Sequence, residues 1–221
     1  MSDISKEDGA SAPRTFYLKD YQAPAYLVEE IELRFELDPA TTRVSNRMRV
    51  VRNPQSGAAD NTLELAGQNL ELEALRVDGV DLGAGDYELD TDSLRLPGLA
   101  ERAVVEIETL IHPQANTALE GLYVSGSMFC SQCEAEGFRR ITFFPDRPDV
   151  MTRYTTTLVA DKARYPVLLS NGNLVKHGAT DDGRHWATWQ DPFPKPSYLF
   201  ALVAGDLFCQ EDSFRTRSGR D

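Results

Sequence analysis

Apolar and charged residues alternate strictly over residues 31–37, which read Ile-Glu-Leu-Arg-Phe-Glu-Leu. Successive side chains of a β-strand point to opposite faces, so this run predicts a strand with one buried face and one wet face. Residues 44–51 resume the alternation after Asp38 and Pro39, and one face of this second run is formed by Val44, Asn46, Met48 and Val50. We expect the two runs to pair as a hairpin.

Short apolar runs continue through the first half of the chain, separated by turn residues such as Asp78-Gly79 and Pro97-Gly98. The predicted strands are residues 62–65, 70–77, 87–89, 94–96 and 103–111. Turns at this spacing are typical of antiparallel sandwiches and barrels. The pattern therefore predicts an all-β fold, a large antiparallel β-sandwich or open barrel.

The second half of the chain is also β-rich but more irregular. Residues 140–144 read as a short aromatic strand that ends at Pro145, and residues 152–160 alternate again. Residues 167–170 lead into Asn171-Gly172, a dipeptide that favours a hairpin turn. No long amphipathic helix is predicted in either half.

The chain has 221 residues, which fits one large all-β domain or two small ones. It carries 23 Lys and Arg against 35 Asp and Glu, a formal net charge of −12. A surface this negative repels phosphate backbones and anionic lipid, so no nucleic-acid partner and no membrane partner is expected. It suits cationic partners, including the free amino end of a peptide.

Residues 1–15 are polar and lack an apolar signal core, so they are expected to form a flexible tail before a domain at 16–221. No run reaches the roughly 20 apolar residues that a transmembrane helix needs. The three cysteines, an odd and low number, favour reduced thiols in a cytoplasmic protein.

No complete metal or nucleophile motif stands out. Cys130 and Cys133 form a C-x-x-C pair, but there is no second pair and the three histidines lack ligand spacing. Two reduced thiols on a turn are the preferred interpretation. The chain also lacks G-x-S-x-G and the glycine-rich phosphate loops.

The densest polar cluster lies at residues 132–139, Gln-Cys-Glu-Ala-Glu-Gly-Phe-Arg. If the segment is extended, Glu134 and Glu136 share a face, and their like charges raise the pKa of one carboxyl. Such a pair could do acid–base work, as in glycosidases. A solvated loop is the alternative, and the residues alone favour it.

Seven segments, in order, resemble the N-terminal domain of the bacterial aminopeptidase N family of zinc metallopeptidases. They are N-T-A-L-E-G-L-Y at 116–123, C-E-A-E-G-F-R at 133–139, D-R-P-D at 146–149, L-S-N-G-N at 169–173, W-Q-D-P-F-P-K-P at 189–196, Y-L-F-A-L-V-A-G-D at 198–206 and T-R-S-G-R at 216–220. The resemblance extends over most of the chain from about Tyr17 onward, so no single motif carries the match.

The resemblance implies a saddle-shaped antiparallel β-domain that precedes a thermolysin-like catalytic domain of the same protein. In the family the zinc ligands and the general base lie on an H-E-x-x-H helix of that later domain, with a further Glu downstream. This sequence contains no such motif, so the resemblance implies neither catalytic residues nor metal ligands here. The fragment alone is therefore expected to be inactive.

The resemblance does carry over substrate-binding residues. Glu134 matches the family's glutamate that binds the free α-ammonium group of a peptide substrate, and Gln132 matches a residue lining the pocket for the first side chain. Glu136 matches no functional position and is expected to be structural. The rival interpretation is a free-standing β-sandwich module that binds a protein or ligand, which the length of the native gene product would distinguish.

Overall fold

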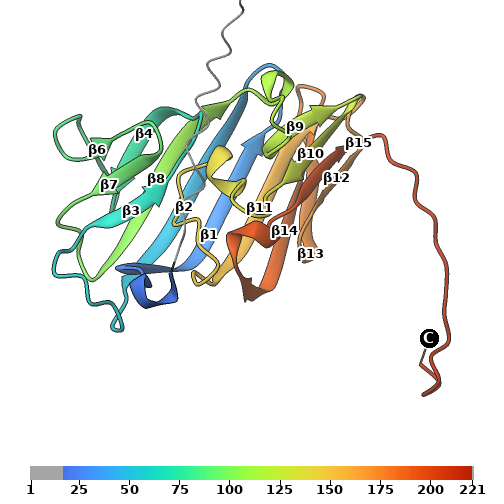
Figure 1. The fold of residues 1–221 in the computed structure, drawn as a ribbon. Coiled ribbons are helices and arrows are strands. Elements are labelled where there is room, and N and C mark those ends of the chain that lie inside the picture. Colours follow the sequence, from blue (N-terminus) through green and yellow to red (C-terminus); the bar gives the residue numbers. More distant parts are fainter. Residues whose placement is uncertain (1–16, 221) are drawn as a thin grey trace, which may run out of the picture.

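Residues 17–220 are described by a computed structural model, so the predicted tail at 1–15 lies outside the described residues. The largest unit is an eight-stranded sheet in the order β13-β14-β11-β1-β2-β8-β4-β5 (Figure 1). Its strands, in that order, are Asn173–Ala179, Arg184–Lys195, Thr152–Asp161, Tyr26–Glu36, Thr42–Arg52, Arg102–Ile111, Glu71–Val77 and Val80–Asp81.

Two smaller sheets complete the strands of the described residues. One has the order β12-β15-β10-β9, with bounds Val167–Ser170, Leu202–Gly205, Met128–Gln132 and Gly121–Ser125. The other has the order β3-β7-β6, with bounds Leu63–Ala66, Ser93–Leu96 and Glu88–Leu89. Residues 17–220 also contain four short 3-10 helices, η1 to η4, which span Leu18–Asp20, Pro113–Ala115, Phe138–Arg140 and Ser197–Leu199.

The all-β prediction is confirmed, since residues 17–220 contain no α-helix. The eight-stranded sheet is open, because its outermost strands β13 and β5 do not pair. It is mixed rather than purely antiparallel: β1 and β11 pair in parallel, in a register that aligns Glu30 with Arg153 and Glu36 with Val159. No helix in the described part of the chain is long and apolar enough to cross a membrane.

The alternation seen in the sequence places the core. On β1, Ile31, Leu33 and Phe35 are buried while Glu32 and Arg34 are exposed. The predicted hairpin with residues 44–51 is confirmed as the β1–β2 pair. The outward face of the sheet carries cross-strand ion pairs; Arg47, for example, lies 3.1 Å from Glu32 and 3.3 Å from Glu106. These exposed pairs each add little stability.

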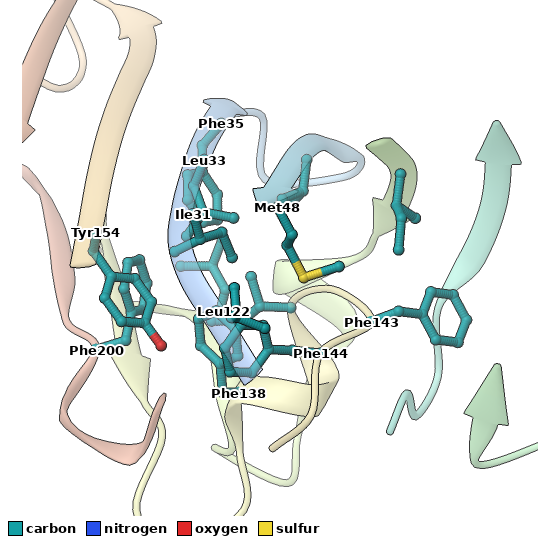
Figure 2. Close-up of a cluster of buried hydrophobic side chains, with 14 of the residues drawn as sticks. Ile31, Leu33, Phe35, Met48, Leu122, Phe138, Phe143, Phe144, Tyr154 and Phe200 are labelled. Carbon is teal, nitrogen blue, oxygen red and sulfur yellow. The ribbon is translucent and has the colours of Figure 1, made fainter. Parts of the chain in front are cut away.

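Buried side chains from all three sheets form one core cluster. Residues 138–146, which we call the strap, run through it and appear as the yellow segment in the middle of Figure 1. Figure 2 shows Phe138 and Phe144 of the strap close to Tyr154 and Phe200. The Phe138 ring packs edge-on against two of these rings, with its centroid 5.1 Å from that of Phe144 and 5.2 Å from that of Phe200. These aromatic contacts fix the strap against the large sheet.

Polar contacts hold the strap as well. The buried Asn46 side chain on β2 donates to the Thr142 hydroxyl at 3.1 Å and to the Phe143 carbonyl at 3.0 Å. Phe144 forms one isolated bridge with Ala66 of β3. The predicted strand at 140–144 is therefore wrong. The helix η3 includes its first residue, and the remaining residues are buried irregular chain with the single bridge to Ala66.

The hairpin predicted at Asn171-Gly172 is also wrong. The segments on either side are strands, β12 and β13, but β12 pairs with β15 and β13 pairs with β14. The turn therefore carries the chain from one sheet to another. Strand β13 forms a hairpin with the next strand instead, while β12 pairs with the distant β15, and the turn residues do not report either choice.

Candidate functional site

The polar cluster found in the sequence forms a tight loop at the end of β10. We call residues 133–137 the acidic loop. The Gly137 amide donates to the Cys133 carbonyl at 2.8 Å, which closes the loop, and the chain passes directly into η3. The exposed Gln132 side-chain amide donates to the Glu134 carbonyl at 3.2 Å, so the two predicted site residues lie together. The Glu134–Ala135 peptide bond is cis.

The two carboxylates of the loop have different surroundings. Glu136 pairs with Arg139 at 3.2 Å. Glu134 is exposed, and nothing in residues 17–220 forms an ion pair or a hydrogen bond with its carboxylate. Because Glu136 is compensated and Glu134 is not, Glu134 is the acidic-loop carboxylate available to a cationic ligand. The roles assigned to these residues, ligand binding by Glu134 and Gln132 and a structural role for Glu136, stay predictions.

A buried ion pair between Arg139 and Asp146 lies next to the acidic loop. The Asp146 side chain is 1% exposed and that of Arg139 is 17% exposed. One carboxylate oxygen of Asp146 accepts from Arg139 Nε at 3.0 Å and from the Arg139 amide at 3.2 Å. Its other oxygen accepts from the Ser197 hydroxyl, which lies on η4. A buried charge with this many donors is fully compensated.

Sequence reasoning missed this support. Arg139 follows Glu136 by three residues, and that spacing could have suggested their pair. Asp146 and Ser197 give no comparable signal, because only the path of the strap brings them to Arg139. Their partnership depends on tertiary structure rather than on any local motif.

Cys133 lies at the base of the loop and is buried, with a pKa raised by burial and, to a smaller extent, by the Asp146 carboxylate. Cys130 is half-buried, Cys209 is exposed, and all three thiols are free. Residues 17–220 hold no group of three or more His, Cys, Asp or Glu side chains that could bind a metal ion. The described residues therefore do not fit a zinc site.

A groove of about 1,040 Å³ lies beside the strap, between residues 22–26 and strands β3 and β7. Arg139 and Asp146 contribute to its wall, but residues 132–136 do not. The Glu134 carboxylate thus stands outside this groove, on an exposed loop. A closed pocket around it would need a second wall from outside residues 17–220.

Comparison with known proteins identifies the family. Residues 28–199 match the peptidase M1 N-terminal domain. Over 209 residues the chain is 49% identical to aminopeptidase N of Escherichia coli, and it is equally identical over the same length to that of Caulobacter vibrioides. These matches cover 95% of this chain but only 23% and 24% of the relatives, so the chain spans about a quarter of their length.

Solved structures show the same relationship. Aminopeptidase A of Legionella pneumophila, solved in complex with aspartic acid, superposes with a TM-score of 0.86 at 38% identity, covering 92% of this chain and 24% of that one. An M1 zinc metallopeptidase of Deinococcus radiodurans gives 0.69 at 14% identity, covering 83% and 43%, and supports the fold alone. From its sequence match and its fold, the chain belongs to the peptidase M1 N-terminal domain family.

Proposed function

We propose that this chain is the substrate-recognising N-terminal domain of a cytoplasmic zinc aminopeptidase that removes single residues from the amino ends of peptides. The observation that carries the proposal is the exposed, uncompensated Glu134 carboxylate, held on a short loop above a buried ion pair. Relatives named aminopeptidase N and a related structure that holds an amino acid support it.

The chemistry of chain-end recognition explains the proposed role of Glu134. The amino end of a peptide differs from an internal residue by one positive charge, and a fixed carboxylate selects for that charge. In the proposal Glu134 accepts hydrogen bonds from the α-ammonium group. Gln132, bonded to the Glu134 main chain, lies beside the first side chain of the substrate.

The rest of the parent protein has two parts in this proposal. It supplies the zinc ligands, since the described residues contain no ligand set, and we assign no metal-dependent step to this chain. It also supplies the second wall that closes a pocket around Glu134. The catalytic domain of the same protein is thus the proposed partner of the acidic loop.

The substitution Glu134→Gln in the parent enzyme tests the proposal. A hydrogen bond to a charged group contributes about 1.5–3 kcal/mol, and about 1.4 kcal/mol corresponds to a factor of ten. We therefore expect kcat/KM for a peptide with a free amino end to fall roughly 10- to 100-fold. The preference for this peptide over its N-acetylated twin should fall with it.

Glu136→Gln is the matched control, because it removes the neighbouring carboxylate that Arg139 already compensates. This variant should keep the preference for free amino ends and change stability instead. If Glu134→Gln leaves kcat/KM for the free-amine peptide within about twofold of wild type, the proposed role is wrong.

A further inference from the structure

The Arg139–Asp146 pair joins the two ends of the strap. Arg139 Nε donates to the Asp146 carboxylate at 3.0 Å, and Arg139 Nη2 donates to the Asp146 main-chain carbonyl at 3.1 Å. These bonds hold the two ends of the strap together, so the strap forms a closed loop through the core. The acidic loop leads directly into the strap, because its last residue, Gly137, precedes η3.

The pair also connects the loop to the neighbouring sheet. Asp146 accepts from Ser197 on η4, and η4 leads into β15. Strand β15 pairs with β10, aligning Cys130 with Val203, and the Ser131 hydroxyl bonds to Leu202. The acidic loop is the continuation of β10. Both ends of the acidic loop are therefore fixed to the same neighbour, one through strand pairing and one through Asp146.

The Arg139 guanidinium links the buried Asp146 to the exposed acidic loop. Asp146 is buried and holds the guanidinium of Arg139, and the opposite side of that guanidinium pairs with Glu136 at 3.2 Å. The guanidinium thus compensates one buried carboxylate and one exposed carboxylate. Glu134, two residues before Glu136, is left as the uncompensated charge of the loop. Removing Asp146 would release the guanidinium that fixes this arrangement.

We propose that Asp146 is a positioning residue for Glu134: through Arg139 and Ser197 it fixes the acidic loop so that the Glu134 carboxylate meets the α-ammonium group of the substrate. This inference rests on the proposed function. Asp146 touches neither substrate nor metal in this role. It acts because a misplacement of about 1 Å in a binding group can cost up to about a hundredfold in rate.

A double-mutant cycle in the parent enzyme tests the inference with Asp146→Asn, Glu134→Gln and the combination. The amide of Asn has nearly the shape of the carboxylate but lacks its charge and one acceptor oxygen. The ion pair with Arg139 is therefore lost, and the Ser197 hydroxyl can no longer donate to that second oxygen. We expect Asp146→Asn to lower kcat/KM roughly tenfold in the wild-type background, and less than about twofold when Glu134→Gln is present.

The outcomes separate the two ideas. If Glu134→Gln lowers kcat/KM but Asp146→Asn costs the same factor in both backgrounds, Asp146 does not act through Glu134 and the inference is wrong. If Glu134→Gln alone has no effect, the proposed function fails, and this inference fails with it. A purely structural Asp146 would lower the thermal midpoint equally in both backgrounds without any such dependence of kcat/KM.

Two further variants keep the test decisive. Ser197→Ala removes one hydrogen bond from Asp146 and leaves the ion pair; if Asp146→Asn does not fold, this variant should show the same dependence on Glu134 with a smaller loss. Asp149→Asn is the matched control, because it breaks the nearby Arg147–Asp149 pair, which has no contact with the acidic loop. It should leave kcat/KM within about twofold, and an equal loss in Asp149→Asn would overturn the inference.

Discussion

At the scale of single residues, Gly137 closes the acidic loop at a point that has no room for a side chain. A Cβ built there lies 2.3 Å from the Gln132 carbonyl oxygen, 2.9 Å from the Gly121 amide nitrogen and 3.1 Å from Cys133 Cα. All three neighbours are main-chain atoms, so the clash can be relieved only by moving backbone. The glycine is therefore required by close packing, since its φ of −80° is ordinary.

We predict that Gly137→Ala destabilises the domain by about 1–3 kcal/mol, the usual cost of overpacking. The free energy of unfolding measured in urea checks this. The control is Gly57→Ala, where a Cβ meets nothing within 4 Å; its effect should stay within about 0.5 kcal/mol. Equal effects of the two substitutions would contradict the structure around Gly137.

The cysteines give a second prediction at this scale. Cys133 is buried and its pKa is raised, so at pH 8 it should stay an unreactive thiol, while the exposed Cys209 should react. Titration with a chromogenic disulfide in native buffer, then in denaturant, separates them. Cys209→Ser should remove the fast reaction. Modification of Cys133 at the rate of Cys209 would disprove its burial.

The residues of the site differ in how far the sequence could identify them. The cluster of Glu134 and Glu136 stands out in the sequence, and the resemblance to the family separates their roles. In the structure the two carboxylates differ in that Glu136 pairs with Arg139, while their roles stay predictions. The support from Asp146 needs the buried course of the strap, and local sequence does not encode where a long-range segment lies.

At the scale of elements, prediction succeeded where one face of a strand is wet. Residues 31–36 and 103–111 lie in β1 and β8, where every second side chain is buried and the glutamates lie on the other face. The strand prediction failed at residues 140–144, because a segment surrounded by the core is apolar in any backbone conformation, and its apolar side chains do not indicate a strand. The turn at 171–172 failed for a different reason: turn residues fix a local bend but not the strand that each arm will pair with.

The turn between β13 and β14 allows a prediction about pH. The Asp182 carboxylate accepts from the Thr180 hydroxyl, from Arg184 Nε at 2.8 Å and from the Arg184 amide at 3.2 Å. These contacts, with Thr180 the largest contributor, lower the pKa of Asp182 to about 2. A lowered pKa in the folded state stabilises the fold above the unfolded pKa, and this contribution is lost as the pH falls through the folded value.

We therefore predict that Asp182→Asn is less stable than wild type at pH values above about 4, and that the difference shrinks as the pH falls from about 4 to about 2. Urea unfolding at a series of pH values measures it. A difference that stays constant over this range would show that Asp182 does not titrate as the turn geometry requires.

At the scale of the whole molecule, the chain spans about a quarter of the length of its aminopeptidase N relatives, and the described residues hold no metal-binding group. We predict that the purified 221-residue chain shows no hydrolysis of an alanyl chromogenic substrate and contains far less than one zinc ion per chain. The parent enzyme, assayed in parallel, is the positive control. Turnover by the isolated chain that a chelator abolishes would contradict the proposed division of function.

The parallel pairing of β1 with β11 has a consequence for the order of events during synthesis. Glu30 pairs with Arg153, more than a hundred residues further along the chain, whereas β1 and β2 are neighbours in sequence. On a ribosome, β1 can pair on one side early, but its other edge stays open until β11 emerges. Such non-local pairing slows folding, and an open edge strand can recruit another nascent chain. Chains that end before residue 152 lack β11, so β1, which lies inside the finished sheet, remains an unpaired edge strand. We therefore expect such chains to aggregate.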